Sequence, residues 1–343
     1  MDDVNPIGAD RRTTAGVGIE DVHRIEFDVD WPPGHVAAYL LDTPEPTLID
    51  TGMTGERAGD RLEEALTAAG YDLADVAHLV LTHPHVDHVG QVPTVIERAH
   101  PTVCAPVGVR ERLGRDPDDL ARQVEANATA AGLEGTERDR AIGMARESLE
   151  RSRRLLPPAA VDRWIGEDGN DAITIGDVAF ETIPTPGHQA DHRCFETTIE
   201  GERVLFAGDT VLAPFRPVLL HVGLDRGVRE GLPAFERTLD RLAARSIGRV
   251  FPGHGPVHEE YGETIDRDRR SLRRLAEGVA NRLDPESGTT AAELARERVE
   301  DERKFAYRLP EVVSALARLE ATDRARRSTT EAGVRRYRPV STE

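Results

Sequence analysis

Short apolar runs bounded by polar and turn residues along this chain predict two groups of β-strands separated by a helical segment. The first group comprises strands at residues 22–27, 36–41, 47–49, 76–81 and 102–105, with a helix at residues 56–69 that ends at Gly70. The second group comprises strands at residues 172–175, 178–182, 194–199 and 204–207, followed by an amphipathic helix at residues 229–244. This mixture of strands and helices places the chain in the α/β class.

Residues 108–164 interrupt the strand pattern with a polar, helical segment. Asp116 directly before Pro117 predicts the N-cap and first residue of one helix, and Thr136 with Asp139 resembles the capping pair of another. Because the strand pattern resumes afterwards, we interpret the segment as an insertion into one domain that spans residues 20–261. A flexible leader is expected at residues 1–19.

The chain after residue 261 has a different pattern of predicted elements, with helices first and two strands at the end. Helices are predicted at residues 266–280, 290–299 and 310–319, and two candidate strands follow at residues 324–328 and 334–339. Three helices and a two-stranded wing resemble a winged helix, so a winged-helix-like domain is predicted over residues 262–343. The alternative is a charged helical tail that packs on the core or completes a dimer.

The net charge is −18, from 62 Asp or Glu against 44 Lys or Arg. Residues 262–343 hold 18 basic and 16 acidic side chains, whereas residues 1–261 hold 26 and 46, so the negative charge lies in the first part. With Lys304 as the only lysine, this composition resembles that of haloarchaeal proteins, whose acidic surfaces suit high salt. An acidic protein from a GC-rich genome is the alternative.

The two cysteines, Cys104 and Cys194, do not indicate a disulfide framework, which fits a reducing cytoplasm. The N-terminus has no apolar core of a secretory signal, and no apolar run reaches membrane-spanning length. A cytoplasmic protein without a membrane partner is therefore expected.

Three imidazoles and a carboxylate fall within six residues directly after the strand predicted at residues 76–81: His83, His85, Asp87 and His88. In extended backbone, side chains two positions apart point the same way, so His83 and His85 can bind one ion while Pro84 keeps the chain extended. If a helix begins at residues 89–91, Asp87 and His88 turn toward a second ion. These ligand types suit zinc, and also iron or manganese.

Three further candidate ligands each follow a short apolar run and a glycine: His188, Asp209 and His254. Loops at strand ends are where a rigid scaffold displays functional groups, and glycine allows the backbone to approach closely around an ion. These three side chains are therefore predicted to join the first cluster.

The ordered set HxHxDH, distant His, Asp and His resembles the metallo-beta-lactamase superfamily over roughly residues 20 to 260. The resemblance implies a four-layer αββα fold, in which two facing sheets lie between layers of helices. It implies two divalent metal ions, the first bound by His83, His85 and His188. The second would be bound by Asp87, His88 and His254, with Asp209 bridging both.

Details of the motif narrow the resemblance. True beta-lactamases of this superfamily lack the bridging aspartate, so Asp209 favours its thioesterase and phosphodiesterase-like branches. Flavodiiron oxidoreductases of this superfamily generally carry a glutamate at the position of His85, so this histidine favours hydrolysis over oxidoreductase chemistry. Asp50 resembles a supporting residue rather than a ligand. In this superfamily insertions such as residues 108–164 overhang the metal site, so we interpret this one as a substrate-selecting lid, with a dimerisation arm as the alternative.

A water held between two divalent ions loses its proton near neutral pH and becomes a hydroxide nucleophile, which Asp87 is predicted to orient as the catalytic residue. The leading hypothesis is a hydrolase of small esters, hydroxyacylglutathione-like thioesters or lactones. The first alternative is an endoribonuclease or phosphodiesterase, because lactamase-like endoribonucleases resemble this chain in the region of His188 and carry a C-terminal winged helix that presents single-stranded RNA. The second is a non-catalytic nucleic-acid-binding or regulatory protein.

Other histidines are weighed separately. His192 is equally compatible with bracing the loop that holds His188 and with a polar surface position. His35 and His221 flank the predicted site, but a structural or solvent-facing role is favoured for both. No functional role is predicted for the remaining histidines, which are His23, His78, His100 and His258.

Overall fold

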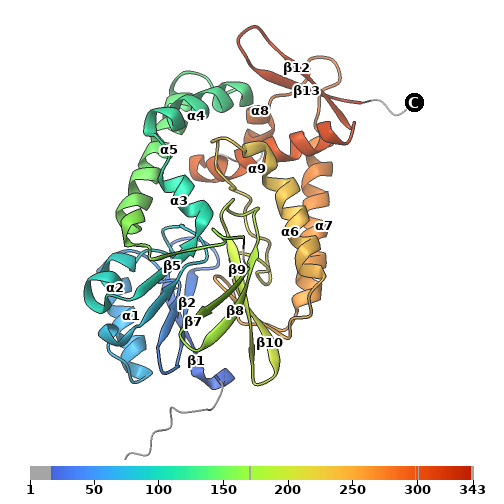
Figure 1. Cartoon of the computed structure of the whole chain (residues 1–343). Coiled ribbons are helices and arrows are strands. Elements are labelled where there is room, and N and C mark those ends of the chain that lie inside the picture. The colour runs from blue at the N-terminus through green and yellow to red at the C-terminus, as the bar shows by residue number, and fades with distance from the viewer. Residues whose placement is uncertain (1–16, 170, 298, 300, 341–343) are drawn as a thin grey trace, which may run out of the picture.

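Two β-sheets face each other at the centre of the molecule, and helices cover the outer face of each (Figure 1). The structure is a computed structural model that describes residues 17–340 apart from positions 170, 298 and 300. The first sheet has the order β1-β2-β3-β4-β5-β6 and the second the order β11-β10-β9-β8-β7. This is the four-layer α/β fold expected from the sequence.

The strands of the first sheet are β1 (Val22–Asp28), β2 (His35–Leu41), β3 (Thr47–Ile49), β4 (His78–Val80), β5 (Thr102–Pro106) and β6 (Arg163–Ile165). Those of the second are β7 (Ala172–Ile175), β8 (Val178–Pro184), β9 (Arg193–Ile199), β10 (Glu202–Gly208) and β11 (Arg249–Pro252). β1 to β3 pair antiparallel and β3 to β6 parallel, whereas in the second sheet only β10 and β11 pair parallel.

Strand periodicity explains the layers, and β2 is the clearest case. Tyr39 and Leu41 point into the core between the sheets, whereas Ala38 and Leu40 point into the core under the helices. Between the sheets, Phe206 and Phe251 stack with ring centroids 5.0 Å apart. β2 is therefore buried on both faces.

The first sheet is covered by α1 (Glu56–Ala68), α2 (Val92–Ala99) and α3 (Val107–Leu113). The second is covered by α6 (Gly231–Ala243), α7 (Tyr261–Ala280), α8 (Ala291–Arg296) and α9 (Glu302–Ala321). Within the described part of the chain, short 3₁₀ helices lie at Ile19–Asp21, Leu73–Asp75, Pro158–Ala160 and Val228–Glu230. Among the described residues no helix combines the length and the apolar character that crossing a membrane requires.

The predicted insertion forms α4 (Pro117–Ala131) and α5 (Gly135–Leu155), which pack on each other through Leu120, Val124 and Leu149. Asp116 caps α4 as predicted, because its carboxylate accepts from the N–H groups of residues 118 and 119. The prediction that Thr136 caps the next helix is wrong. α5 begins at Gly135 with Glu134 as its N-cap, so Thr136 lies inside the first turn.

The C-terminal segment forms the predicted helices and the hairpin of β12 (Ala325–Thr329) and β13 (Arg335–Pro339). Two predicted helix starts are wrong, because α7 begins at Tyr261 rather than at residue 266, and Pro310 lies inside α9 rather than at its start. Burial overrides the local signal there: eleven residues of this helix are buried, and the packing of its flanks outweighs the backbone hydrogen bond that a proline lacks. Part of the predicted helix at 290–299 falls at position 298, outside the described residues.

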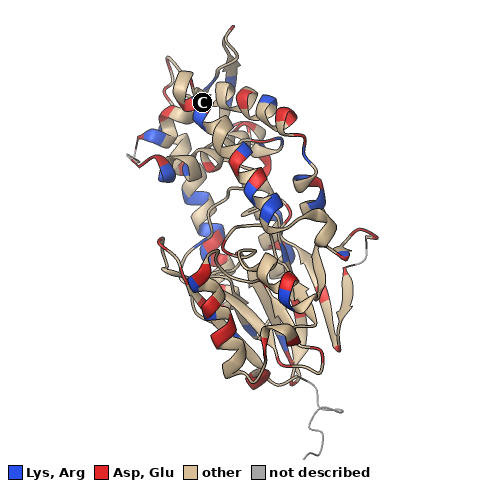
Figure 2. Cartoon of the chain, turned by 90° about the vertical axis from the view of Figure 1, so that its left-hand side faces the viewer, with Lys and Arg blue, Asp and Glu red and all other residues tan. Residues whose placement is uncertain are grey.

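The hydrophobic core continues across the predicted domain boundary at residue 261. Leu205 of β10 and Phe235 of α6 belong to the same cluster as Leu272 of α7, Leu316 of α9 and Tyr337 of β13. Acidic and basic residues interleave on the upper helices (Figure 2). The C-terminal segment is therefore packed into the core of the second sheet.

The predicted leader lies mostly outside the described residues, which begin at Val17. At its end, Val17 and Ile19 instead pack against the core between the sheets. The helix expected from residues 89–91 begins slightly later, at Val92.

Gly90 fills a position where the backbone of two loops meets. A Cβ at this position would lie 2.2 Å from the carbonyl carbon of Met53 and 2.4 Å from the nitrogen of Thr54. We expect Gly90→Ala to destabilise the protein by about 1–3 kcal/mol, because the clash is with backbone that must shift. Chemical unfolding monitored by circular dichroism measures this change.

Gly143 provides the matched control. It lies inside α5, and a Cβ there would meet no atom within 4 Å. Gly143→Ala should therefore stabilise the protein by about 0.5–1 kcal/mol. A Gly90→Ala variant as stable as the parent would contradict the close packing of these loops.

Candidate metal centre

The chain leaves β4 in a buried loop that is held by one carboxylate. The backbone N–H of Thr82 donates to Asp50 Oδ1 at 2.9 Å, and its hydroxyl donates to Asp50 Oδ2 at 2.7 Å. Asp50 itself follows β3 with a φ of 58°, a conformation that aspartate tolerates better than most residues. The parallel neighbours β3 and β4 thereby bring Asp50 beside the histidine segment.

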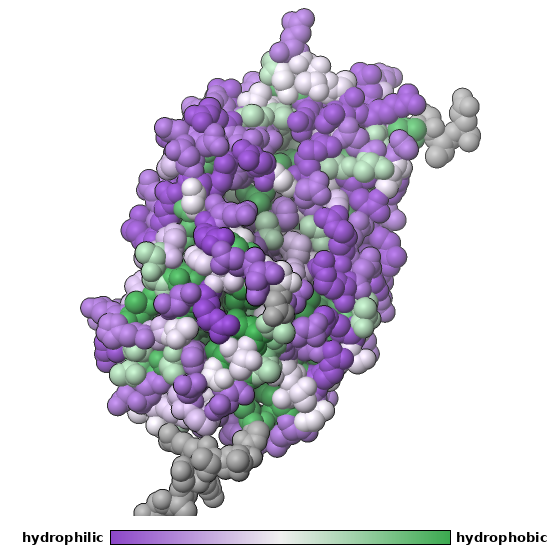
Figure 3. Space-filling model, in the orientation of Figure 1, coloured by the Kyte–Doolittle hydropathy of each residue, from purple (hydrophilic) through white to green (hydrophobic). Residues whose placement is uncertain are grey.

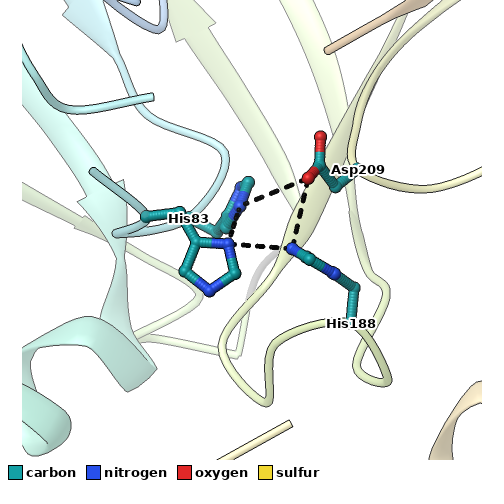
Figure 4. Close-up of side chains that lie close together, drawn as sticks. His83, His188 and Asp209 are labelled. Atoms are coloured by element: carbon teal, nitrogen blue, oxygen red, sulfur yellow. Dashed lines mark hydrogen bonds and ion pairs between the residues drawn. The ribbon is translucent and has the colours of Figure 1, made fainter. Parts of the chain in front are cut away.

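Four side chains meet in a first group: His83, His85, His188 and Asp209. His85 Nδ1 lies 3.0 Å from His83 Nε2 and 2.9 Å from His188 Nε2. Asp209 Oδ2 lies 3.2 Å from His188 Nε2 and 4.0 Å from His83 Nε2. Figure 4 shows His83, His188 and Asp209 pointing toward one another from different loops.

Three side chains meet in a second group: Asp87, His88 and His254. His254 Nε2 lies 3.3 Å from Asp87 Oδ2. Asp209 adjoins this group as well, with its Oδ1 3.2 Å from His88 Nε2 and its Oδ2 3.5 Å from His254 Nε2. The structure thus brings together all seven side chains that the sequence singled out, with Asp209 between the two groups.

Glycines make this convergence sterically possible, as predicted. A Cβ on Gly208 would lie 2.6 Å from His192 Nε2. A Cβ on Gly253 would lie 2.6 Å from Asp209 Oδ1 and 2.6 Å from His88 Cε1. Side chains at either position would displace the cluster.

Four of the five imidazoles have their outward nitrogen bonded to an acceptor. His88 Nδ1 donates to Asp50 Oδ2 at 2.8 Å, and His83 Nδ1 donates to the Thr82 hydroxyl at 2.9 Å. His188 Nδ1 and His254 Nδ1 donate at 2.7 Å to the carbonyls of Val218 and His35, respectively. Because a neutral imidazole carries one N–H, each of these rings in its neutral form presents an Nε2 lone pair to the cluster.

Burial and charge divide the histidines into two sets. Burial and the neighbouring imidazoles lower the pKa of His83, His85 and His188 below the usual value. Burial also opposes protonation of His88, but the carboxylates of Asp209 and Asp50 outweigh it and raise its pKa. The pKa of His254 is raised in the same way, against burial, by Asp209 and Asp87.

The two carboxyl groups of the cluster respond in the opposite direction. Burial raises the pKa of Asp87, but His254 and His88 outweigh it and hold the pKa at about 2. Burial likewise opposes ionisation of Asp209, while His254, His88 and His188 hold its pKa well below the usual value. Both side chains are therefore carboxylates at neutral pH, which is the form that binds cations.

The donor set fits divalent metal ions. His88 Nε2 and Asp209 Oδ1 are buried and have no hydrogen-bond partner among the described residues. These two atoms lie 3.2 Å apart without a hydrogen bond, which is costly for buried polar atoms, and a cation between them would satisfy both. Imidazole nitrogens and carboxylate oxygens are ligands of zinc, iron and manganese, and the ligand atoms of each group lie within 4.8 Å of one another.

His192 braces the loop that holds His188, one of the two roles weighed for it, because its Nδ1 lies 2.7 Å from the Thr185 hydroxyl, and it also braces the loop of Asp209. It is 1% exposed, and its Nε2 accepts the backbone N–H of Asp209 at 3.0 Å. His221 is buried rather than solvent-facing, and its backbone N–H donates to the carbonyl of His188 at 2.7 Å. His35 contributes its backbone carbonyl to His254.

Sequence reasoning missed Arg112, Gln189 and Asp191. The Gln189 amide contacts His85 Nε2 and also accepts from the Arg112 guanidinium of α3. Both carboxylate oxygens of Asp191 are buried without a hydrogen bond among the described residues, 3.9 Å from Arg112 at the nearest. The position of Gln189 next to His188 was the signal available in the sequence.

Comparison with known proteins gives one family over most of the chain. The family described as the Metallo-beta-lactamase superfamily matches residues 31–254. The crystal structure of a metallo-beta-lactamase family protein from Thermus thermophilus is similar with a TM-score of 0.75. It is 24% identical and covers 94% of this chain and 99% of its own, a likeness that concerns the fold.

Curated relatives are similar over shorter stretches. The Beta-lactamase-like protein 2 homolog of Caenorhabditis elegans is 26% identical to this chain. The match covers 66% of this chain and 58% of that protein. The Probable metallo-hydrolase YqjP of Bacillus subtilis is 26% identical over 77% of this chain and 81% of its own length. The Atrochrysone carboxyl ACP thioesterase nsrC of Aspergillus novofumigatus is 23% identical over 71% of this chain, which spans 58% of that enzyme.

Asp50→Asn tests whether the orientation of His88 prepares the second group for a metal ion. The amide must direct a donor either at His88 Nδ1 or at the N–H of Thr82, so one bond is lost in each orientation. We expect affinity for one divalent ion to fall about 10- to 100-fold in a competition titration with a chromophoric chelator.

Asp42→Asn is the control, since it makes the same chemical change at a carboxylate that bonds Tyr71 away from the cluster. Parent-like metal affinity in Asp50→Asn would show that this carboxylate does not set the ring orientation.

Proposed function

The chain belongs to the metallo-beta-lactamase superfamily of metal-dependent hydrolases, and on that premise we propose that it hydrolyses acyl esters or thioesters at a centre of two divalent ions. One observation carries this proposal. Asp209 lies between two groups of buried ligand atoms, with Oδ1 3.2 Å from His88 Nε2 and Oδ2 3.2 Å from His188 Nε2. A carboxylate in that position is suited to bridge two cations.

We propose zinc as the ion, with iron or manganese as alternatives. The seven ligands are those named from the sequence: His83, His85, Asp87, His88, His188, Asp209 and His254. Five imidazoles and two carboxylates suit zinc. Such ions, when bound, supply a water of lowered pKa and a Lewis acid for the substrate oxygen.

The protein's own residues then have distinct tasks. The carboxylate of Asp87 has a low pKa, so it can accept a hydrogen bond from the attacking water and orient it. The pairs of His88 with Asp50 and of His188 with the Val218 carbonyl keep the ligand rings from turning during the reaction. Asp87 is thus the proposed catalytic residue.

An exposed apolar side chain beside the candidate centre favours an acyl substrate. Val218, whose carbonyl bonds His188, leaves 38% of its surface exposed, one of three large apolar side chains exposed among the described residues. Figure 3 shows apolar residues among polar ones along the middle of the face seen in Figure 1. A thioesterase among the relatives supports thioesters, which could include hydroxyacylglutathione-like ones, with lactones as related small molecules.

The insertion is proposed to act as a lid that selects these substrates. Arg115, just before α4, pairs with Asp225 at 2.8 Å, and Asn127 donates to the carbonyl of Leu224 at 2.8 Å. These bonds attach α4 to the loop that follows Asp209. A dimerisation arm is the alternative, and a homodimer would bury the outer face of this segment.

A second candidate function is hydrolysis of single-stranded RNA, favoured by the hairpin of β12 and β13. Arg326 lies directly opposite Arg338 in its register, and like charges in that position repel unless an anion lies between them. Among the described residues neither forms an ion pair within 4 Å. A winged helix that presents RNA would use this surface, although the burial of α9 leaves the hairpin rather than that helix available.

The experiment is a hydrolysis assay with acyl thioesters, lactones, bis(p-nitrophenyl) phosphate and single-stranded RNA at high salt. We expect thioesters to be cleaved, activity to be lost on chelation, and zinc to restore it. Asp209→Ala should lower kcat/KM about 100-fold or more, because it removes the bridging carboxylate. Asp240→Ala makes the same change at an exposed α6 residue and should be neutral.

Each outcome of the assay separates the candidates. Cleavage of RNA or phosphodiester without thioester cleavage would favour the second function. A protein that binds fewer than one ion per chain and cleaves none of these substrates would instead be a non-catalytic nucleic-acid-binding or regulatory protein.

We also propose that the protein functions at high salt, as in a haloarchaeal cytoplasm. A charge of −18 repels itself in dilute buffer, and salt screens this repulsion. The melting temperature is expected to rise from dilute buffer to molar KCl. Calorimetry measures it, and no rise with KCl would contradict a halophilic origin of the composition.

A further inference from the structure

One peptide unit outside the ligand set is hydrogen-bonded on both sides. The carbonyl of Val218 accepts from His188 Nδ1 at 2.7 Å. The N–H of the same peptide, which belongs to Leu219, donates to Glu311 Oε1 at 3.0 Å. A carboxylate, a peptide and a ligand imidazole therefore form one continuous chain of hydrogen bonds.

Glu311 is buried, and hydrogen bonds from Arg216 and from the N–H of Leu219 compensate its charge. It lies on α9 and is 7% exposed. The same Oε1 accepts from Arg216 Nη2 at 2.7 Å, and Arg216 also donates through Nε to Ser271 of α7 at 3.2 Å. Two C-terminal helices thus hold the loop that follows Asp209.

This chain of hydrogen bonds affects the imidazole of His188. A carboxylate that accepts from a peptide N–H polarises the peptide and strengthens its carbonyl as an acceptor, by about 10–30% per bond. A stronger acceptor at Nδ1 fixes the ring and raises the basicity of Nε2, the atom that faces Asp209. Free rotation of the peptide would remove both effects.

We propose that Glu311 is a positioning residue for the metal centre, which acts on His188 through the peptide between Val218 and Leu219. The inference rests on the proposed role of His188 as a metal ligand. It extends the site to a helix beyond residues 31–254, the part of the chain that matches the family. Asp50 acts on His88 directly, whereas Glu311 acts through one intervening peptide.

Metal binding tests the proposal without any substrate. Zinc affinity is measured for the full chain by competition with a chromophoric chelator, and cobalt spectra report the geometry of the two sites. In Glu311→Gln a neutral amide replaces the charged acceptor, so one of two ions should bind about tenfold more weakly. In Glu311→Leu no acceptor remains, and the loss should approach about 100-fold.

Glu320→Gln is the matched control on the same helix. Glu320 pairs with Arg229 and Arg327, away from the loop that contacts His188. This variant should keep the parent affinity for both ions, even if its melting temperature falls. The difference between the two glutamates separates an effect on the site from a general effect on α9.

Glu311→Gln decides the matter, even if Glu311→Leu fails to fold. Parent-like affinity for both ions in Glu311→Gln, with or without a lower melting temperature, would overturn the positioning role and leave a structural one. A parent protein that binds no metal would overturn the proposed centre itself. Two tightly bound ions in the parent and one weakened ion in Glu311→Gln would support both.

Discussion

A buried imidazole can present a lone pair inward only if something outside holds its proton. Most of the arrangement around the metal centre follows from this constraint, because four rings have their outward nitrogen bonded to a chosen acceptor. The acceptors come from distant parts of the chain: a carboxylate after β3, a hydroxyl after β4, and two backbone carbonyls. The two facing sheets bring these segments to one end and keep the rings from turning.

The sequence predicted the parts of this arrangement that depend on residue type. Histidine and aspartate at strand ends have few common uses together, so the seven candidate ligands could be named before their geometry was known. The supporting role of Asp50 was implied by the family resemblance. The carbonyl of Val218 could not, because every residue has a carbonyl and no side chain marks the one that matters. Glu311 was invisible for a related reason: its effect depends on a contact 92 positions away in the chain.

Local signals failed where tertiary packing outweighed them. Pro310 suggested a helix start, but the buried flanks of α9 extend the helix through it. Thr136 suggested a cap, yet the N-cap lies two residues earlier, at Glu134, and the helix begins at Gly135. Most strands were predicted closely because short apolar runs bounded by turn residues are a strong signal, but β6 was missed at the end of the segment predicted to be helical. The extent of the core beyond residue 261 had no local signature.

Because the core is shared, the part of the chain that packs together extends beyond residues 31–254, the part that matches the family. A protein ending near residue 254 would contain every proposed ligand, yet it would expose to water the faces of β10 and α6 that α7 and α9 now cover. The peptide before Leu219 would also have lost its acceptor. In this chain the C-terminal helices pack into the same core as the second sheet of the family fold, rather than extending from it as a separate tail.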